Sequence, residues 1–278
     1  MKLSVIIPVY NEIHTLDTLL DKVIKVLPEV EKEIILVDDC STDGTRQWLE
    51  HNFVSESFAD DSNNLGLVNL NSHPYQIKAV EDSFQLQQPN TDLVVKDAKP
   101  QNISFKVVYH QTNRGKGAAL RSGFEIAQGD VLVIQDADLE YDPQDWVKMW
   151  RIIAEGNGDV VFGSRFYGDP HRVLYFHHLL GNKVISNVIN IFCNTTLSDI
   201  EVCYKMFRRE VLEGIELTCN DFGFEVEFTV KITKSERKWR IYETGISYYG
   251  RTYDEGKKIS WRDGVKALWY IVKFRFFA

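Results

Sequence analysis

Short apolar runs alternate with helix-like stretches along the chain, and this alternation limits the fold more than any other feature of the sequence. The runs are rich in Val and Ile and occupy residues 3–9, 33–37, 105–109, 131–134 and 160–162. Helical patterns between them cover residues 13–27, 42–51, 116–127 and 143–154. Continuous apolar runs are typical of parallel strands buried on both faces. We therefore expect an α/β fold with a mostly parallel central sheet flanked by helices, whose ligands bind at the carboxyl ends of the strands.

A polar segment, residues 52–102, interrupts this alternation. It is rich in Asn, Gln, Ser and Asp and shows weak periodicity. We interpret it as an insertion between the second and third core strands that is partly ordered at most, because loops of this length are unusual in a compact domain. A surface insertion without a role in function is the simpler interpretation. We expect residues 1–230 to form the main domain.

The remaining segment, residues 231–278, is a small C-terminal extension that is basic and aromatic. It holds twelve Lys and Arg residues against five Asp and Glu, whereas the whole chain has a net charge of −8. The overall negative charge argues against a general nucleic-acid-binding protein. A basic extension on an acidic body favours a local anionic partner, such as phosphate groups or a membrane surface.

Two apolar segments bear on membrane contact. Residues 176–192 form an amphipathic helix pattern, and residues 267–277 mix aromatic side chains with Lys273 and Arg275. Each could pack on the protein body or lie at a membrane interface. The chain has no uninterrupted apolar run of the roughly 18–20 residues that a membrane span requires, and its cysteines show no disulfide or zinc-ligand spacing. We expect a cytoplasmic protein in peripheral contact with a membrane.

The strongest chemical signal is the triplet Asp136-Ala137-Asp138, directly after the apolar run 131–134. Mg²⁺ and Mn²⁺ prefer oxygen ligands and usually share one or two carboxylates with substrate phosphates. Glu140, two residues later, is a candidate third ligand. A solvated acidic turn is the alternative interpretation, but the position at the end of a strand favours a metal site.

Further polar motifs follow other predicted strands. Carboxylates there could contact a nucleobase or ribose, or could cap helices instead. A glycine-containing segment that opens a helix favours anions, and arginines suit phosphate contacts, although solvated surface positions would look the same. The candidates are Pro8, Tyr10 and Glu12; Asp39; Lys116 in the segment 113–117; Arg165; and Arg251 with Lys257 and Lys258.

Taken together, these motifs resemble the family 2 glycosyltransferases with a Rossmann-like GT-A fold, and most closely their dolichyl-phosphate mannosyltransferase-like branch. The resemblance covers about residues 1–50 and 103–265. It rests on the stretches SVIIPVYNE, ILVDDCSTDGT, NRGKGAALRSG, GDVLVIQDADLEYDP, VVFGSRF, SDIEVCYKMFRREV, FGFEVE and YYGRTYDEGKKISW. The sequence departs from the family pattern at Cys40, where Gly or Asp is more usual, and in the insertion 52–102.

The resemblance implies inverting transfer of a hexose, mannose or glucose, from a nucleotide sugar such as GDP-mannose or UDP-glucose. It implies that Asp136, Asp138 and Glu140 hold Mg²⁺ or Mn²⁺, and that Arg165, Arg251 and Lys257 or Lys258 face phosphates. The remaining nucleotide-sugar contacts that it implies are Pro8, Tyr10, Glu12, Val37, Asp39, Lys116 and Ala137.

The resemblance leaves the acceptor open. A polyprenyl phosphate is already an anionic nucleophile and needs no general base, whereas a soluble or glycan hydroxyl requires one. Asp199 lies where relatives present an acceptor-side acid, but capping or a structural salt bridge would explain it equally. Glu225 is a weaker candidate of the same kind. We expect the catalytic group to comprise Asp138, Asp199, Arg165 and Arg251, and the acceptor to be a polyprenyl phosphate. A nucleotide-sugar-binding protein without turnover is the non-enzymatic alternative.

Overall fold

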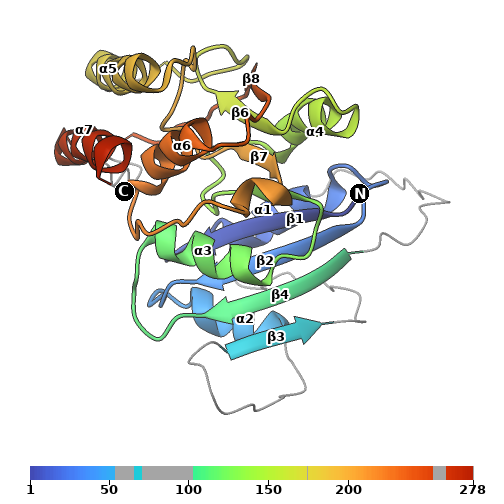
Figure 1. Cartoon of the computed structure of the whole chain (residues 1–278). Helices are drawn as coiled ribbons and strands as arrows, with labels where there is room; N and C mark the ends of the chain where they lie inside the picture. Colours follow the sequence, from blue (N-terminus) through green and yellow to red (C-terminus); the bar gives the residue numbers. More distant parts are fainter. Residues whose placement is uncertain (54–65, 71–102, 174, 253–260, 278) are drawn as a thin grey trace.

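Eight strands join in one mixed sheet, which organises the whole described part of the chain (Figure 1). A computed structural model describes residues 1–53, 66–70, 103–173, 175–252 and 261–277. The strands lie in the order β3-β4-β2-β1-β5-β7-β6-β8. Their bounds are β1 Leu3–Val9, β2 Lys32–Asp38, β3 Gly66–Leu70, β4 Ile103–Tyr109, β5 Val131–Ile134, β6 Val160–Ser164, β7 Lys205–Arg208 and β8 Ile241–Gly245.

The sheet is parallel at its centre, as the alternation of runs and helices predicts. The strands β4, β2, β1 and β5 run parallel to one another, and β6 pairs in parallel with β8. The strand β7 is antiparallel to both β5 and β6, and β3 is antiparallel to β4. Every residue of β2 is buried, which explains its unbroken apolar run.

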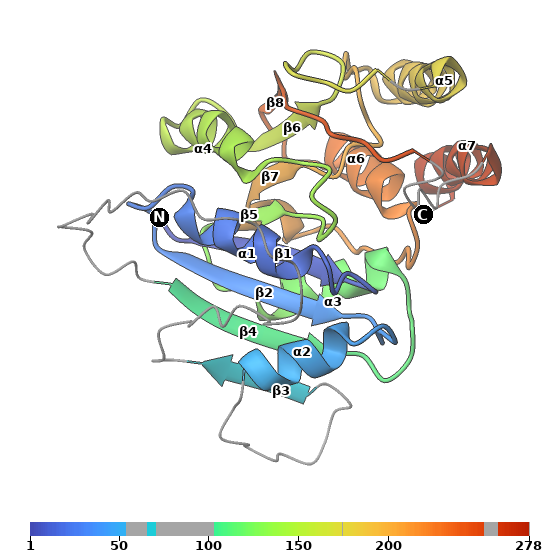
Figure 2. The ribbon, with the colours of Figure 1, turned by 180° about the vertical axis from the view of Figure 1, so that it is seen from behind.

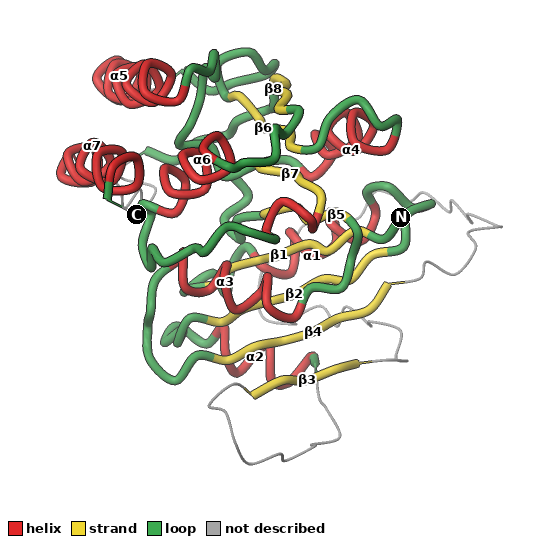
Figure 3. Tube along the Cα trace, viewed as in Figure 1, coloured by secondary structure: helices red, strands yellow, loops and turns green. Residues whose placement is uncertain are grey.

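Helices flank both faces of this sheet. In Figures 1 and 2, α3 lies on one face, whereas α1 and α2 lie on the other; Figure 3 separates the helices from the strands by colour. In α1, the buried residues Leu16, Leu19, Leu20 and Val23 follow helical spacing, so one stripe packs on the sheet. The helix bounds are α1 Leu16–Lys25, α2 Thr45–Asn52, α3 Lys116–Ile126, α4 Trp146–Ala154, α5 Phe176–Cys193, α6 Phe224–Lys234 and α7 Trp261–Phe276, with short 3₁₀ helices at Pro143–Asp145 and Arg209–Leu212.

The C-terminal extension is part of the same layered body. It supplies the edge strand β8, and α7 packs against α5 and α6. The boundary expected after residue 230 falls inside α6. None of the helices in the described ranges combines the length and the apolar character that a membrane span needs.

Part of the polar insertion also joins the sheet, because its residues Gly66–Leu70 form β3. The rest of the insertion, residues 54–65 and 71–102, lies outside the described residues, as do Lys257 and Lys258.

Two buried charged side chains at the start of β2, Lys32 and Glu33, connect this strand to neighbouring segments. Lys32 donates hydrogen bonds to the carbonyl oxygens of Val23 and Ile24, at 3.1 and 2.8 Å, and to that of Val26. It therefore satisfies the last carbonyls of α1. Glu33 accepts hydrogen bonds from Lys106 of β4 at 3.0 Å and from the backbone nitrogen of Gly129 at 2.9 Å.

Candidate active site

A cavity of about 580 Å³ opens at the carboxyl ends of the central strands. Parallel strands bring the segments that follow them to one edge of the sheet, which is why residues far apart in sequence meet there. Helices α5 and α7 contribute its outer wall. Polar and charged side chains make up much of the lining, which includes Pro8, Tyr10, Glu12, Asp39, Gly115, Lys116, Asp136, Ala137, Asp138, Glu140, Arg165, His178, Asn182, Glu201, Cys203, Asp221, Glu225, Tyr248, Arg251, Lys266, Ala267 and Tyr270.

At one end of the cavity, Asp39 connects the end of β2 to the start of α3. Its two carboxylate oxygens accept hydrogen bonds from the backbone nitrogens of Arg114 and Gly115, at 2.8 and 2.7 Å. One of them also lies 2.7 Å from Nδ1 of His110. Asp39 therefore organises the loop before α3, where positive charge of the helix dipole supports a carboxylate.

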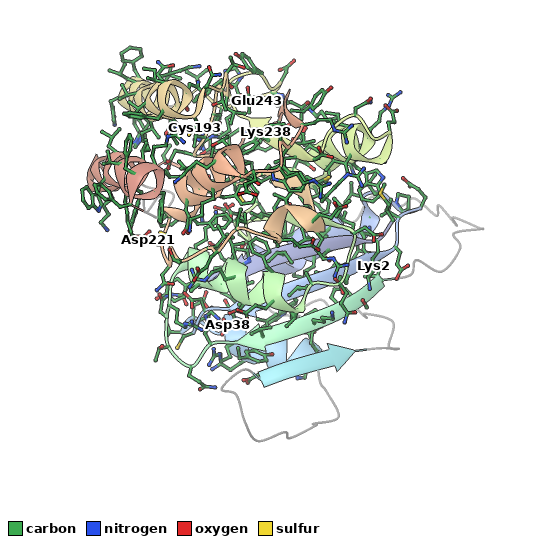
Figure 4. All side chains as sticks on the ribbon, viewed as in Figure 1. Lys2, Asp38, Cys193, Asp221, Lys238 and Glu243 are labelled. Atoms are coloured by element: carbon green, nitrogen blue, oxygen red, sulfur yellow. The ribbon has the colours of Figure 1, made fainter. Side chains whose placement is uncertain are left out.

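The glycines of the segment 113–117 serve close backbone packing. Gly115 has a φ of +91°, which favours glycine, and a Cβ on Gly117 would lie 2.3 Å from the carbonyl oxygen of Cys219. The glycines let the segment 219–221 lie close to them, and that segment includes Asp221, which lines the cavity as Gly115 does and is labelled in Figure 4.

The carboxylates that follow β5 are paired with cations. Lys116 lies 2.7 Å from an oxygen of Asp136, and Arg251 donates to Asp138 at 2.8 Å. Glu140 accepts hydrogen bonds from the backbone nitrogen of Arg251 at 2.9 Å and from the hydroxyl of Tyr248 at 3.0 Å. Burial, together with the charges of Asp136 and Glu140, raises the pKa of Asp138 to about 7, although Arg251 acts in the opposite direction.

The carboxylates of Asp136 and Asp138 are hard oxygen donors of the kind that a divalent cation shares with phosphates. Glu140 is the expected third ligand. Glu140 is held by Arg251 and Tyr248, and no three His, Cys, Asp or Glu side chains within the described ranges are grouped as a metal centre. The three-carboxylate site stays a prediction, because each of its members has a cationic partner: Lys116 for Asp136, and Arg251 for Asp138 and Glu140.

Arg165 follows β6 and lines the cavity, and the carboxylate of Asp199 holds its guanidinium group. Its Nε and Nη2 atoms donate to the two oxygens of Asp199, at 2.7 and 2.6 Å. The Asp199 side chain is fully buried and is not part of the cavity lining. Glu243 of β8, labelled in Figure 4, accepts hydrogen bonds from the backbone nitrogens of Ser198 and Asp199, at 2.8 and 3.2 Å. Asp199 thus acts on the cavity through Arg165, which corresponds to the salt-bridge interpretation.

A second charged group is connected to the triplet Asp136-Ala137-Asp138 through Lys116. Glu225, in the first turn of α6, is bonded to the buried Lys205 through one oxygen, and its other oxygen lies 3.4 Å from Lys116. Lys116 therefore connects Glu225 to Asp136. Cys203 also lines this part of the cavity, and burial raises the pKa of its thiol, so it stays protonated.

The cavity brings together most of the residues expected from the sequence. Val37 and Asp199 are exceptions, because both are fully buried and do not line the cavity, and Lys257 is outside the described residues. Several lining residues were not singled out from the sequence. Tyr248 precedes Arg251 closely and Glu201 follows Asp199 by two positions, whereas no sequence signal identifies the cavity-facing positions His178, Asn182, Lys266 and Tyr270 on the two C-terminal helices.

The sequence model described as "Glycosyl transferase family 2" matches residues 4–56 and 85–215, more than half of the chain. Together with the sheet order and the strand-end cavity, this match defines the class as a glycosyltransferase of GT-A fold. The chain belongs to glycosyltransferase family 2.

Named relatives share about a quarter of their residues with the chain. A dolichol-phosphate mannosyltransferase of Pyrococcus furiosus is 27% identical over 93% of this chain and 61% of its own length. An undecaprenyl-phosphate mannosyltransferase of Micrococcus luteus is 26% identical over 92% of this chain and 87% of its own length. The chain thus spans less than two thirds of the Pyrococcus relative.

Solved structures agree in fold. Glucosyl-3-phosphoglycerate synthase from Mycobacterium tuberculosis, in complex with Mn²⁺, UDP and phosphoglyceric acid, superposes with a TM-score of 0.61 at 12% identity, covering 100% of this chain and 79% of that one. TarS 1–349 from S. aureus, in complex with UDP-GlcNAc, gives a TM-score of 0.53 at 18% identity, covering 98% and 66%. At such identities the likeness concerns the fold alone.

Proposed function

We propose that this protein is an inverting hexosyltransferase that moves mannose or glucose from GDP-mannose or UDP-glucose to a polyprenyl phosphate. The observation that carries the proposal is the single cavity that joins Asp39, the aspartates of the triplet and two arginines. In this proposal, Asp39 lies near the nucleoside, the aspartates of the triplet hold the cation that binds the diphosphate, and the two arginines face the phosphate of the acceptor. The names of the P. furiosus and M. luteus relatives support the choice of sugar and acceptor.

The donor diphosphate needs a counter-charge, and the triplet fits a divalent cation, Mg²⁺ or Mn²⁺. Asp136 and Asp138 would hold the ion, because each has a carboxylate at the cavity wall. When bound, such an ion neutralises the charge that develops on the leaving diphosphate. Lys116, now paired with Asp136, supplies a further positive charge at the same place.

The acceptor would be oriented by Arg165 and Arg251. Both line the cavity, and the bidentate pair with Asp199 restricts Arg165 to one direction. A phosphate monoester held by arginines presents an anionic oxygen, which attacks the anomeric carbon as the bond to the diphosphate breaks. This single displacement inverts the anomeric centre and needs no general base. Because both oxygens of Asp199 are engaged by Arg165, the contacts support a phosphate acceptor over a hydroxyl acceptor activated by Asp199.

The surface beside the cavity suits a lipid-linked acceptor. Helices α5 and α7 lie side by side at one end of the molecule (Figures 1 and 2). The ring centroids of Phe192 on α5 and Phe276 on α7 are 5.6 Å apart. Large apolar side chains on this pair of helices are exposed, among them Phe176, Leu180, Ile191, Trp269 and Phe276. A polyprenyl chain or a membrane interface would cover such side chains. We propose that the protein works as a peripheral protein at the cytoplasmic face of a membrane.

The test is transfer of labelled sugar. Purified protein is incubated with Mn²⁺ or Mg²⁺, labelled GDP-mannose or UDP-glucose, and vesicles that contain a polyprenyl phosphate. We expect one donor to label the lipid, with inversion seen by NMR of the product. Asp136→Asn should lower the rate by about 100-fold, since it removes one of the charges that organise the diphosphate site. Asp21→Asn, on the exposed side of α1, is the matched control and should retain the wild-type rate.

Two results would contradict the proposal. If no donor labels the lipid under any of these conditions, the assigned acceptor is wrong. If label appears instead on a soluble or glycan hydroxyl, the protein belongs with the hydroxyl-transferring members of its family. Metal-dependent nucleotide binding without hydrolysis or transfer would indicate a binding protein.

A further inference from the structure

Four buried side-chain atoms in the described part of the chain have no hydrogen-bond partner. They are the indole nitrogens of Trp146 and Trp239 and one carboxylate oxygen each of Glu201 and Glu225. The two tryptophans do not line the cavity, whereas both glutamates do. Glu225 is nevertheless held by Lys205 and lies 3.4 Å from Lys116. Glu201 is therefore the carboxylate in this wall whose buried oxygen, Oε1, lacks a donor.

The surroundings of Glu201 make this lack costly. Its neighbours in sequence, Ile200 and Val202, are fully buried. Burial raises its pKa to about 7, with the charge of Glu225 acting in the same direction and those of Arg165 and Lys205 opposing it. A carboxyl group removed from water without a hydrogen-bond partner destabilises a fold. A ligand that supplies a donor would remove this cost.

Glu201 lies on the Arg165 side of the cavity. The charges that act on it come from Glu225, Arg165, Lys205 and Asp199. Those that act on Asp138 come from Asp136, Glu140 and Arg251. In the order of the sheet, Glu201 shortly precedes β7 and so lies on the side of β5 away from β2, after which Asp39 follows. In a bound nucleotide sugar, the group beyond the diphosphate is the hexose.

We propose that Glu201 accepts a hydrogen bond from a hydroxyl of the hexose that is transferred. A hexose presents neutral hydroxyl donors, which match an acceptor oxygen, whereas a phosphate would bring negative charge next to Glu201 and Glu225. A polyprenyl phosphate carries no alcohol hydroxyl, so the donor sugar is the source within the proposed function, on which this inference rests. Glu201 is then a determinant of which hexose the site accepts.

Calorimetric titration tests the assignment. Wild-type protein and Glu201→Met are titrated, in the presence of Mn²⁺, with GDP-mannose, UDP-glucose and the free nucleotide diphosphates. We expect Glu201→Met to bind the preferred nucleotide sugar about tenfold more weakly, because a hydrogen bond to a charged group is lost. Binding of the free diphosphate should not change. The melting temperature should stay the same or rise, because an apolar side chain of similar size replaces a half-buried glutamate whose buried oxygen has no hydrogen-bond partner.

Nucleotide sugars that lack one hydroxyl of the hexose identify the group that Glu201 binds. Removal of the hydroxyl that Glu201 binds should weaken binding to the wild type and leave binding to Glu201→Met unchanged. The matched control is Glu33→Met, which removes a buried glutamate that is fully bonded at the opposite end of the strands. It should lower the melting temperature without changing the ratio of the two affinities.

Several results would overturn the inference. Equal loss of affinity for sugar and free diphosphate, with a lower melting temperature, would make Glu201 a structural residue. Unchanged donor affinity would remove it from the sugar site, even if the Michaelis constant for an acceptor rose. If the wild type itself binds neither nucleotide sugar, the proposed function fails, and the inference fails with it.

Discussion

Asp199 shows how the surroundings of one residue decide its role. Sequence position suggests an acceptor-side acid, but the structure buries it fully beneath Arg165. Removal of one partner of a buried ion pair strongly destabilises a protein, because the other charge then stays buried without compensation. Arg165 would be left in this condition, next to the ring of Tyr248, whose centroid lies 5.4 Å from the guanidinium carbon.

We therefore expect Asp199→Asn to lower the free energy of unfolding by about 3 kcal/mol. Urea denaturation at neutral pH measures the change. Asp21→Asn breaks an exposed pair with Lys25 and should cost about 0.5 kcal/mol at most. If the two variants were equally stable, the pair would not be fixing Arg165, and a direct role of Asp199 in the reaction would regain support.

Among the elements, α1 depends on a contact from outside the helix. Its last carbonyl groups have no partner within the helix, as at every helix end. Lys32, at the start of the next strand, donates to three carbonyls from this end. Burial lowers the pKa of Lys32 to about 8, because water no longer surrounds the ammonium group.

Lys32→Met should destabilise the protein by about 2 kcal/mol, because buried carbonyl groups lose a charged donor. Lys25→Met removes an exposed lysine from the same helix and should change the free energy of unfolding by less than about 0.5 kcal/mol. Chemical denaturation of both variants at pH 7 makes the comparison. Equal midpoints would mean that water satisfies the end of α1 as well as Lys32 does.

The elements themselves were largely predictable, and for a clear reason. Buried parallel strands such as β1 and β2 are apolar throughout, so their positions can be read directly from the sequence. The antiparallel strand β7 was not expected, because its Lys205 and Arg208 break the apolar run. Lys205 is buried all the same, since Glu225 compensates its charge from α6. Such long-range compensation is not visible in a local pattern.

The site was predictable where it depends on strand ends and not where it depends on packing between helices. Asp136, Asp138 and Arg165 follow strands directly, and the sheet brings them together. Which carboxylates remain free depends on pairings across the fold, such as Glu140 with Arg251 and Asp199 with Arg165. Asp199 has such a partner, whereas the buried oxygen of Glu201 has none, and a sequence does not reveal that difference.

At the scale of the whole molecule, Glu33 holds four segments together. It is fully buried and contacts Lys106 of β4, the turn before β5 through Gly129, Ser4 of β1 and Lys2. Burial alone would favour the protonated form. The hydrogen bonds from Ser4, Gln128 and Lys106, with the charge of Lys106, outweigh it and lower the pKa of Glu33 from 4.5 to about 2.

A lowered pKa in the folded state means that the ionised carboxylate stabilises the fold. This stabilisation is complete above pH 4.5, the value for the unfolded chain, and is lost as the pH falls towards 2. We expect wild type to exceed Glu33→Gln in free energy of unfolding by about 3 kcal/mol at pH 6. The difference should shrink between pH 4.5 and 2. Urea denaturation across this pH range provides the measurement, and a constant difference would contradict the assigned pKa.

The strand β3 gives the polar insertion a consequence that has nothing to do with substrates. It pairs antiparallel with β4, from Gly66 opposite Tyr109 to Leu70 opposite Phe105. Without it, β4 would present its unpaired amide and carbonyl groups to any neighbouring chain, and such open edges promote aggregation. The insertion therefore replaces the seven-residue edge of β4 with the five-residue edge of β3, and we expect a chain shortened through this segment to aggregate more readily.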